Sequence, residues 1–322
     1  MSCQSNYKQC TSYIESGIDG AAGFCSVDCA YHCTESLKHN LPIISHTTAG
    51  NLAHCNMSVY YSLICGISPR DEMLPEAVKM GKAWDKFLDD VASGCDVSAC
   101  HYSSGLNDDN KAKFLAITNA FADLAIHIER DGETQPERFV HLSNGILTTH
   151  ADRIYKHYMV ESKFTSRPEN YLTIPNIAHQ VGSYFLAHPD LDRVVMEVAQ
   201  VPQQKLGKTE ELGAYANRIY DDIMARPGCY FRGYKAFNNT FGKTFYRSEF
   251  DLDELKRSYE RQLDELRWRI DNNVWYEHAS RFYCDSPSRC WYKTICDTGC
   301  VSEDLYYIKG KSHKRKESLK DG

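Results

Sequence analysis

The chain has 322 residues, of which 42% are hydrophobic and 25% are charged, and its formal net charge is -6. These proportions are those of a globular protein with a full core, so they exclude a chain that is disordered throughout. The acidic balance argues against a dedicated nucleic-acid-binding protein, which normally carries a basic footprint.

Apolar runs along the chain are short, as at residues 59–64. A membrane-spanning helix needs roughly 20 predominantly apolar residues, so we expect no membrane span. Residues 1–8 contain no apolar stretch, and we see no signal peptide there. These features predict a soluble, cytoplasmic protein, with a secreted protein or a delivered effector as the alternative.

The cysteine content is unusual, because 14 cysteines are present and most of them lie near the two ends of the chain. One interpretation is an oxidised, secreted protein with disulfides, and the other is a reduced protein with buried thiols. The apparent lack of a signal peptide favours the reduced form. Cys25, Cys29 and Cys33 would share one face of a helix, but with His32 they do not make a frequent zinc-binding pattern.

The C-terminal cysteines, Cys284, Cys290, Cys296 and Cys300, are separated by five, five and three residues. Paired CxxC knuckles, which are the strong zinc signal, are absent from this spacing. We therefore predict no metal and no cofactor, and we expect these four side chains to be buried thiols or disulfides.

Residues 1–55 read as a Cys-rich segment of loops and short helices that packs on the core. Residues 56–205 then alternate between strand-like and helix-like patterns. The strands are predicted at 57–65, 96–102, 138–142, 171–177 and 194–201, and the helices at 75–94, 108–129, from 146 to about 159, and 180–188. Such alternation predicts an α/β core with a mostly parallel, doubly wound sheet of about five or more strands.

Residues 206–308 are predicted to form a helical extension. It contains a helix at 210–225 and a long helix at about 251–282. Apolar residues recur every three or four positions along the long helix, which predicts packing on the body of the protein, with self-association as the alternative. Residues 309–322 form a basic tail that we expect to be disordered.

Ligands of doubly wound sheets bind beyond the carboxyl ends of the strands, which directs attention to Ser143. This serine follows the predicted strand 138–142, precedes a predicted helix, and has Gly145 two residues later. A serine on a tight strand-to-helix turn can act as a nucleophile. The backbone N–H of Asn144 could then stabilise an oxyanion. The alternative for Ser143 is a helix N-cap without chemistry.

At this point the order of elements over about residues 55–200 resembles the α/β-hydrolase fold, including an uncharacterised hydrolase-like family of chlamydial proteins. The resemblance implies a three-layer sandwich and a serine, histidine and acid triad. His141 stands where the G-x-S-x-G motif has its first glycine, and no acid follows the fifth strand. His179 and His278 are the candidate bases.

Two functions follow from this resemblance. The first is a degenerate, non-catalytic pseudoenzyme that binds an unknown protein, and the second is a serine hydrolase of small esters with Ser143 as nucleophile. The missing acid and His141 favour the first. A nucleotide-binding doubly wound domain is a third option. Nucleic acid is not an expected partner, and the oligomeric state stays open.

Overall fold

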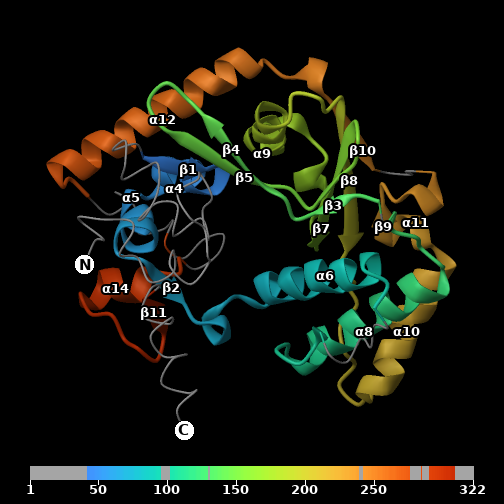
Figure 1. Cartoon of the computed structure of the whole chain (residues 1–322). Helices are drawn as coiled ribbons and strands as arrows, with labels where there is room; N and C mark the ends of the chain where they lie inside the picture. Colours follow the sequence, from blue (N-terminus) through green and yellow to red (C-terminus); the bar gives the residue numbers. More distant parts are fainter. Residues whose placement is uncertain are drawn as a thin grey trace, which may run out of the picture. The chain divides into compact units, whose positions relative to one another are not determined.

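The computed structural model describes residues 42–95, 102–129, 131–238, 242–275, 284 and 290–308. The chain divides into two compact units, and it passes from one to the other four times (Figure 1). Unit 1 takes its described residues from 1–73, 138–149 and 252–322, and unit 2 consists of 74–137 and 150–251. This interleaved division differs from the four consecutive segments expected from the sequence, 1–55, 56–205, 206–308 and 309–322.

Unit 1 combines helices with two small sheets. Its elements are β1 (Ile43–Ser45), α4 (His46–His54), α5 (Asn56–Val59), the π-helix η2 (Tyr60–Ile64), β2 (Ile67–Pro69), η3 (Asp71–Met73), β4 (Glu137–His141), β5 (Ile146–His150), α12 (Leu252–Asn272), α14 (Lys293–Thr298) and β11 (Tyr306–Ile308). The larger sheet has the order β1-β5-β4, and β1 pairs with β5 in parallel. Strands β11 and β2 form an antiparallel pair.

Unit 2 is built around a six-stranded sheet. Its elements are α6 (Glu76–Ala92), α8 (Asp108–Asp123), β3 (Glu133–Thr134), β6 (Arg153–Ile154), β7 (Tyr158–Thr165), η4 (Pro168–Tyr171), α9 (Ile174–Ala187), β8 (Arg193–Gln200), α10 (Leu212–Ala225), α11 (Pro227–Tyr230), β9 (Phe231–Arg232), η5 (Lys235–Phe237), β10 (Lys243–Tyr246) and η6 (Arg247–Glu249). The strand order is β10-β8-β7-β6-β3, and β9 also pairs with β8. Strands β7 and β8 are parallel, whereas β10, β6, β3 and β9 join the sheet antiparallel.

The protein is therefore a mixed α/β protein, but the prediction of a mostly parallel, doubly wound sheet is wrong. Each of the two larger sheets contains a parallel pair, and antiparallel pairs complete the sheet of unit 2. Antiparallel neighbours can be joined by short turns, whereas a doubly wound sheet needs a crossover helix between successive strands. The short connection from β6 to β7 leaves no room for such a helix, and the chain between β3 and β6 forms β4 and β5 in place of one.

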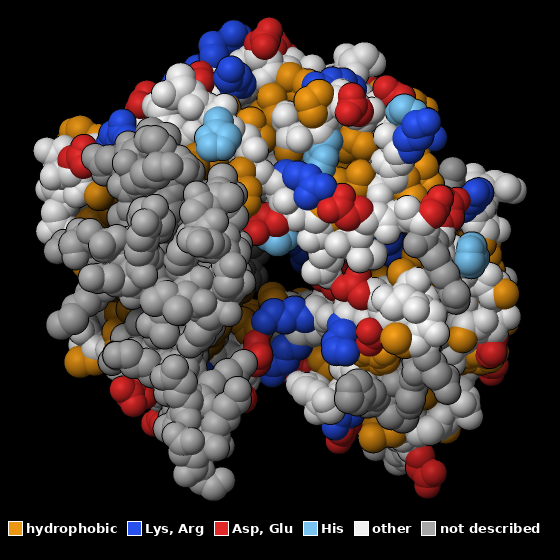
Figure 2. All heavy atoms as spheres, viewed as in Figure 1, with side chains coloured by type: hydrophobic (Ala, Val, Ile, Leu, Met, Phe, Trp, Pro, Cys, Tyr) orange, Lys and Arg blue, Asp and Glu red, His pale blue; other side chains and the backbone are white. Residues whose placement is uncertain are grey.

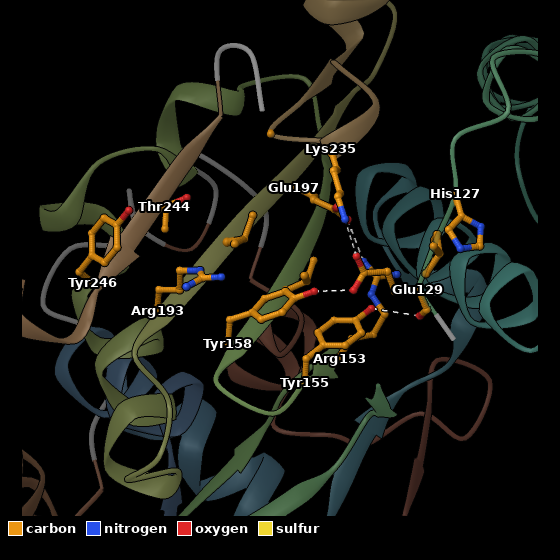
Figure 3. Close-up of a pocket in the computed structure, with 14 residues that line it drawn as sticks. His127, Glu129, Arg153, Tyr155, Tyr158, Arg193, Glu197, Lys235, Thr244 and Tyr246 are labelled. Atoms are coloured by element: carbon orange, nitrogen blue, oxygen red, sulfur yellow. Dashed lines mark hydrogen bonds and ion pairs between the residues drawn. The ribbon is translucent and has the colours of Figure 1, made fainter. Parts of the chain in front are cut away.

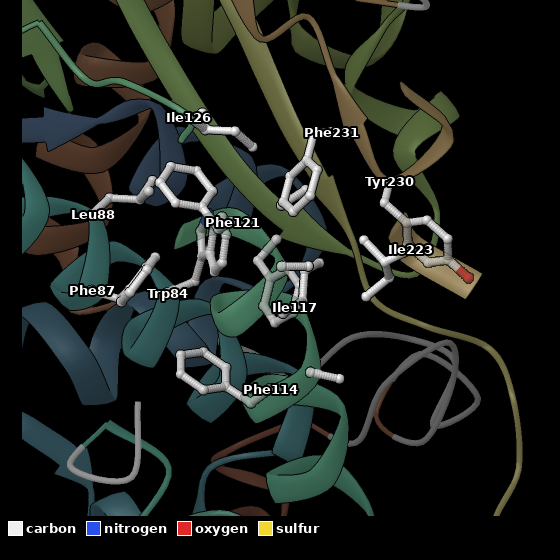
Figure 4. Close-up of a cluster of buried hydrophobic side chains, with 14 of the residues drawn as sticks. Trp84, Phe87, Leu88, Phe114, Ile117, Phe121, Ile126, Ile223, Tyr230 and Phe231 are labelled. Carbon is white, nitrogen blue, oxygen red and sulfur yellow. The ribbon is translucent and has the colours of Figure 1, made fainter. Parts of the chain in front are cut away.

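The core of unit 2 lies between the sheet and the helices α6, α8 and α10 (Figures 1 and 4). The Trp84 ring is fully buried and stacks on Phe164 of β7, with ring centroids 5.0 Å apart. Phe121 of α8 meets the same indole edge to face at 5.7 Å. Because side chains alternate along a strand, this packing of Phe164 turns Glu161 and Lys163 toward the opposite face, where α9 lies.

Residues 57–65 were predicted to form a strand, and this prediction is wrong, because α5 and η2 occupy them. The hydroxyl of Ser62 donates to the carbonyl of Ser58 at 2.7 Å, which supports a helical turn. The Tyr60 ring packs against Trp275 at 5.2 Å. Tertiary packing of the aromatic side chains has thus overridden the β-propensity of this segment.

The predicted helix after residue 145 is also wrong. Residues 146–149 are buried and extended in β5, where Ile146 pairs with Ile43 of β1. The predicted strand 171–177 is replaced by η4 and the start of α9. Pro175 sits in the first turn of α9, where its missing N–H is no loss because helix N-termini leave these groups unpaired.

Other predicted elements match the structure. The helices at 75–94, 108–129 and 210–225 correspond to α6, α8 and α10, and the strands at 138–142 and 194–201 correspond to β4 and β8. The helix predicted at 180–188 belongs to the longer α9. The long helix predicted at about 251–282 is shorter in the structure, because α12 ends at Asn272 and Asn273 has a positive φ of 51°. Among the described residues, no helix is both long and apolar enough to cross a membrane.

Several predictions concern residues that the structure does not describe. The cysteine cluster around Cys29, the predicted strand residues 96–101, the candidate base His278 and the basic tail 309–322 all lie outside the described residues.

Candidate functional site

Ser143 lies in the turn that joins β4 to β5, with residues 142–145 forming what we call the β4–β5 turn. The N–H of Leu142 donates to the carbonyl of Gly145 at 2.9 Å and closes this turn. The expected strand-to-helix turn at Ser143 is therefore wrong, and no helix N-terminus follows the serine to favour a developing negative charge.

Both polar residues of the β4–β5 turn bind helix α12. The Ser143 hydroxyl donates to Glu260 Oε1 at 2.7 Å, and the Ser143 N–H donates to the same oxygen at 3.3 Å. The side-chain amide of Asn144 donates to the Glu260 carbonyl at 2.7 Å and to Asp264 Oδ1 at 2.6 Å. The hydrogen bonds from Ser143 lower the pKa of Glu260. The arrangement ties the turn to the helix.

Gly145 shows how closely the turn approaches α12. A Cβ atom at this position would lie 2.5 Å from Leu263 Cδ2 and 2.7 Å from the carbonyl oxygen of Pro42. The candidate base His179 lies exposed on α9 of unit 2, whereas Ser143 belongs to unit 1 and donates to a carboxylate. The structure thus joins Ser143 and Asn144 to Glu260 and Asp264.

A second polar cluster, not predicted from the sequence, lies on the α9 face of β7. Glu161 is only 1% exposed, and it forms an ion pair with Lys163, two residues along the same strand. Gln180 of α9 donates to Glu161 Oε1 at 2.6 Å, and the hydroxyl of Tyr184 donates to Glu161 Oε2 at 3.0 Å. Gln180 and Tyr184 are four residues apart, so they share one face of the helix.

Asp152 adds a further negative charge. It lies just before β6, and its Oδ2 accepts the N–H of Ser162 at 2.7 Å, which fixes it beside β7. Burial, together with repulsion from Asp152, raises the pKa of Glu161 to about 7. Burial disfavours the charge of Lys163, but the carboxylates of Glu161 and Asp152 outweigh this and hold the pKa of Lys163 above its usual range.

Helix α6, which packs on the opposite face of β7, adds two carboxylates that interact with Asp152. Asp85, Asp89 and Asp152 line a small cavity of about 10 Å³, together with Arg153 and Ser162. Such a volume is close to that of one water molecule. We refer to Asp85, Asp89, Asp152, Glu161 and Lys163 as the acidic site.

Arg153 interacts with the carboxylates of the acidic site, but it is also paired with Glu197. Its Nη2 donates to Ser162 Oγ at 2.6 Å and to Glu197 Oε2 at 2.9 Å, and the side chain is 3% exposed. Burial raises the pKa of Glu197 to about 7 despite this cation. Among the described residues of this region, carboxyl groups therefore outnumber the two cationic side chains, Arg153 and Lys163.

Within the described residues, no group of three or more His, Cys, Asp or Glu side chains meets in a metal-binding arrangement. Mg²⁺, however, is often held by one or two carboxylates and takes its remaining ligands from water and substrate phosphates. Asp152 and Glu161 are the pair best suited to this, because Asp152 repels the Glu161 carboxylate electrostatically and Gln180 and Tyr184 hold Glu161 in place.

The C-terminal cysteines lie in unit 1. The Cys290 N–H donates to the Cys284 carbonyl at 2.7 Å, and burial raises the pKa of the Cys290 thiol, with smaller contributions from Cys55 and Cys284. Cys55, Cys65 and Cys290 carry thiols without disulfides. These three thiols are partly exposed and not fully buried.

The sequence held a signal for the acidic site that the prediction of a helix over residues 146–159 concealed. Residues 158–165 alternate, with Met159, Glu161 and Lys163 at one set of positions and Val160 and Phe164 at the other. Opposite charges two residues apart on a strand lie on the same face. A carboxylate and an ammonium on one face of a strand, with Val160, Ser162 and Phe164 on the other, would have indicated a polar site.

Comparisons with known proteins give little guidance. No protein-family model matches the chain, and no curated protein matches its sequence. Among solved structures, a crystal structure of SSO0001 is similar, with 10% sequence identity and a TM-score of 0.34, covering 80% of this chain and 87% of that chain. The identity and TM-score are too low for an argument about function.

Proposed function

We propose that unit 2 is a divalent-cation-dependent hydrolase of phosphodiesters, with Asp152 and Glu161 as the metal ligands. The observation that carries this proposal is the burial of Glu161 beside the negative charge of Asp152. Two close carboxylates that repel each other destabilise the fold. A bound cation would remove that repulsion, which gives a physical reason for the arrangement.

The substrate class follows from the balance of charge. Arg153 is paired with Glu197, and Lys163 is paired with Glu161, so the acidic site has little spare positive charge. A phosphodiester carries one negative charge, whereas a phosphomonoester carries nearly two at neutral pH. The carboxylates would repel the monoester more strongly, so a diester is the better substrate.

Each side chain then has a task. Asp152 and Glu161 would hold the ion, which supplies charge stabilisation for the phosphoryl oxygens. Lys163 stays protonated at neutral pH, because its pKa is held above the usual range. It therefore acts as a cation beside the phosphoryl group and not as a general base. Gln180 and Tyr184 fix the Glu161 carboxylate.

The reaction adds one water to the phosphorus and breaks one P–O ester bond. The products are a phosphomonoester and an alcohol, and the leaving oxygen takes up a proton. Preorganised groups of this kind give rate enhancements only when they stay fixed, and the second layer of Gln180 and Tyr184 serves that purpose.

Nucleic acids are the phosphodiesters that we propose to test first, in contrast to the expectation from the net charge of -6. On the face seen in Figure 2, Lys and Arg side chains are interspersed with Asp and Glu side chains. Binding of a strand would therefore depend on local contacts near the acidic site and not on a broad basic surface. A hydrolase-like scaffold acting through Ser143, or a binding pseudoenzyme, stays a prediction without support from a specific contact.

The test is hydrolysis of end-labelled single-stranded and double-stranded DNA and RNA with Mg²⁺, Mn²⁺, Ca²⁺ or EDTA. We expect cleavage with Mg²⁺ or Mn²⁺ that Glu161→Gln lowers by about 100-fold or more. The matched control is Glu169→Gln, since Glu169 is an exposed carboxylate on η4 of the same unit. Cleavage that persists in EDTA, or that Glu161→Gln leaves intact, would sink the proposal.

A further inference from the structure

A larger cavity of about 460 Å³ lies on the face of the unit 2 sheet opposite α9, near the amino ends of β7 and β8 (Figure 3). This volume is within the range of small-molecule sites and far exceeds that of an inorganic anion. Arg153 lines this cavity as well as the small cavity of the acidic site, so one side chain borders both.

One end of the cavity holds a cation without a counter-ion. Arg193 at the start of β8 lies beside Thr244 and Tyr246 of β10 (Figure 3). Its guanidinium stands 5.1 Å from the centre of the Tyr158 ring. In the described part of the chain no carboxylate pairs with Arg193, so this end of the cavity favours a negatively charged group.

The opposite end is rich in acceptors. The Glu129 carboxylate accepts from the Tyr158 hydroxyl at 2.6 Å and from Lys235 at 2.9 Å, and Glu197 lies nearby (Figure 3). These carboxylates can accept further hydrogen bonds, because each oxygen has two lone pairs. A ligand that carries N–H or O–H donors suits this end.

The middle of the cavity is flat and apolar. Tyr155 and Tyr158 stack with ring centroids 4.7 Å apart and an interplanar angle of 14°. Ile128, Val160 and Val195 supply aliphatic surface beside them. Such walls suit a planar ring that is apolar on its faces and polar at its edges.

A buried polar atom also points to a ligand. The Arg153 side chain is 3% exposed, and within the described residues its Nε–H has no hydrogen-bond partner. A buried donor without an acceptor costs about 1–3 kcal/mol. An acceptor on a molecule in either of the two cavities that Arg153 borders would satisfy it.

We infer that this cavity binds a nucleoside phosphate, with the phosphate at Arg193 and Thr244 and the base along the tyrosine wall toward Glu129. Anionic, planar and donor-bearing parts occur together in that ligand class. The idea that the cavity is a subsite for a strand cleaved at the acidic site rests on the proposed function. The binding of a nucleoside phosphate does not. The source of the ligand is either a free nucleotide or one unit of a single strand.

The test is calorimetric titration of the full chain, in EDTA, with the four nucleoside 5′-monophosphates, with inorganic phosphate and with short single-stranded oligonucleotides. We expect saturable binding of at least one nucleotide, with inorganic phosphate at least about 10-fold weaker. Arg193→Gln should weaken nucleotide binding by about 10-fold or more, whereas Arg257→Gln, at an exposed arginine of α12, should leave it within about 2-fold.

An oligonucleotide that binds at least about 10-fold tighter than the mononucleotide identifies a strand as the source, and equal or weaker binding identifies the free nucleotide. The inference is overturned when none of the four nucleotides binds up to about 10 mM, or when Arg193→Gln binds like the wild type. Binding in EDTA without cation-dependent cleavage would refute the proposed function alone, and cleavage without nucleotide binding would refute the cavity alone.

Discussion

The β4–β5 turn and the acidic site both gather polar side chains at the end or along the face of a strand, but they differ in burial and in charge. In the turn, Ser143 is exposed, and the side chains of Ser143 and Asn144 donate to acceptors on α12. In the acidic site, Glu161 is buried beside a like charge. The first arrangement stabilises the fold, whereas the second costs stability, and function is the usual reason for retaining such a cost.

The largest expected effect is on catalytic activity, which should depend on the acidic site and not on the β4–β5 turn. Lys163→Met should lower cation-dependent phosphodiester hydrolysis by about 100-fold, because it removes the charge beside the phosphoryl group. Ser143→Ala should leave the rate within about 2-fold, since nothing in the proposed reaction uses that hydroxyl. Initial rates on a labelled oligonucleotide measure both. Labelling of Ser143 by a fluorophosphonate probe would contradict this prediction, because it would show an activated serine in the β4–β5 turn.

The close approach at Gly145 gives the next effect, which concerns stability. Gly145→Ala should lower the free energy of unfolding by about 1–3 kcal/mol, because the new Cβ would overlap Leu263 and the Pro42 carbonyl. Gly50→Ala is the control, since Gly50 lies in α4 of the same unit and a Cβ atom added there would have nothing within 4 Å. Alanine there should be neutral or stabilise by up to about 1 kcal/mol. Urea denaturation of both variants gives the values.

The raised pKa of Glu161 predicts a pH dependence of stability. Below the ordinary value of 4.5 the carboxyl is protonated in both states, and as pH rises through about 7 it must ionise in the buried site, so this stabilising contribution is lost. In EDTA, the wild type should therefore lose about 1–3 kcal/mol relative to Glu161→Gln between about pH 5 and about pH 8. Mg²⁺ should restore part of that loss.

Thermal unfolding at several pH values measures this effect. Parallel curves for the two proteins would mean that Glu161 ionises in the folded state as easily as in water. An equal effect of Mg²⁺ on both proteins would mean that the cation does not bind Glu161.

The smallest expected effect concerns the hydrogen bonds between the β4–β5 turn and α12. Ser143→Ala should lower the free energy of unfolding by about 0.5–1 kcal/mol, because it removes one exposed hydrogen bond to Glu260. Glu260→Gln should have a similar effect, and the double variant should cost less than the sum of the two. Strict additivity in this double-mutant cycle would show that the two side chains do not interact.

Much of the helical structure could be predicted from the sequence, because α6 and α8 carry a regular apolar face around Trp84 and Phe121. The strands were harder, since residues 57–65 have β-branched and aromatic side chains yet are helical through contacts such as Tyr60 with Trp275. Such contacts join positions more than 200 residues apart, which no local pattern reveals. Because residues after 145 were predicted as a helix and form β5, the turn at Ser143 was predicted as a strand-to-helix turn and is a strand-to-strand turn.

The acidic site could have been predicted only in part. The charges of Glu161 and Lys163 are visible within one strand, but their pairing with Gln180 and Tyr184 depends on which face of α9 meets the sheet. The place of Asp152 depends on its hydrogen bond to the Ser162 backbone. Proximity of this kind comes from the tertiary fold and not from spacing along the chain.

The interleaved path of the chain has a consequence for how the protein is made on the ribosome. The β4–β5 hairpin of unit 1 is synthesised in the middle of unit 2, and its helical partner α12 follows more than 100 residues later. Unit 2 can therefore complete its sheet before unit 1 closes. Glu137 and His150, which flank the hairpin, contact each other at 3.3 Å, so residues 138–149 could be replaced by a short loop to obtain unit 2 from a single continuous gene segment.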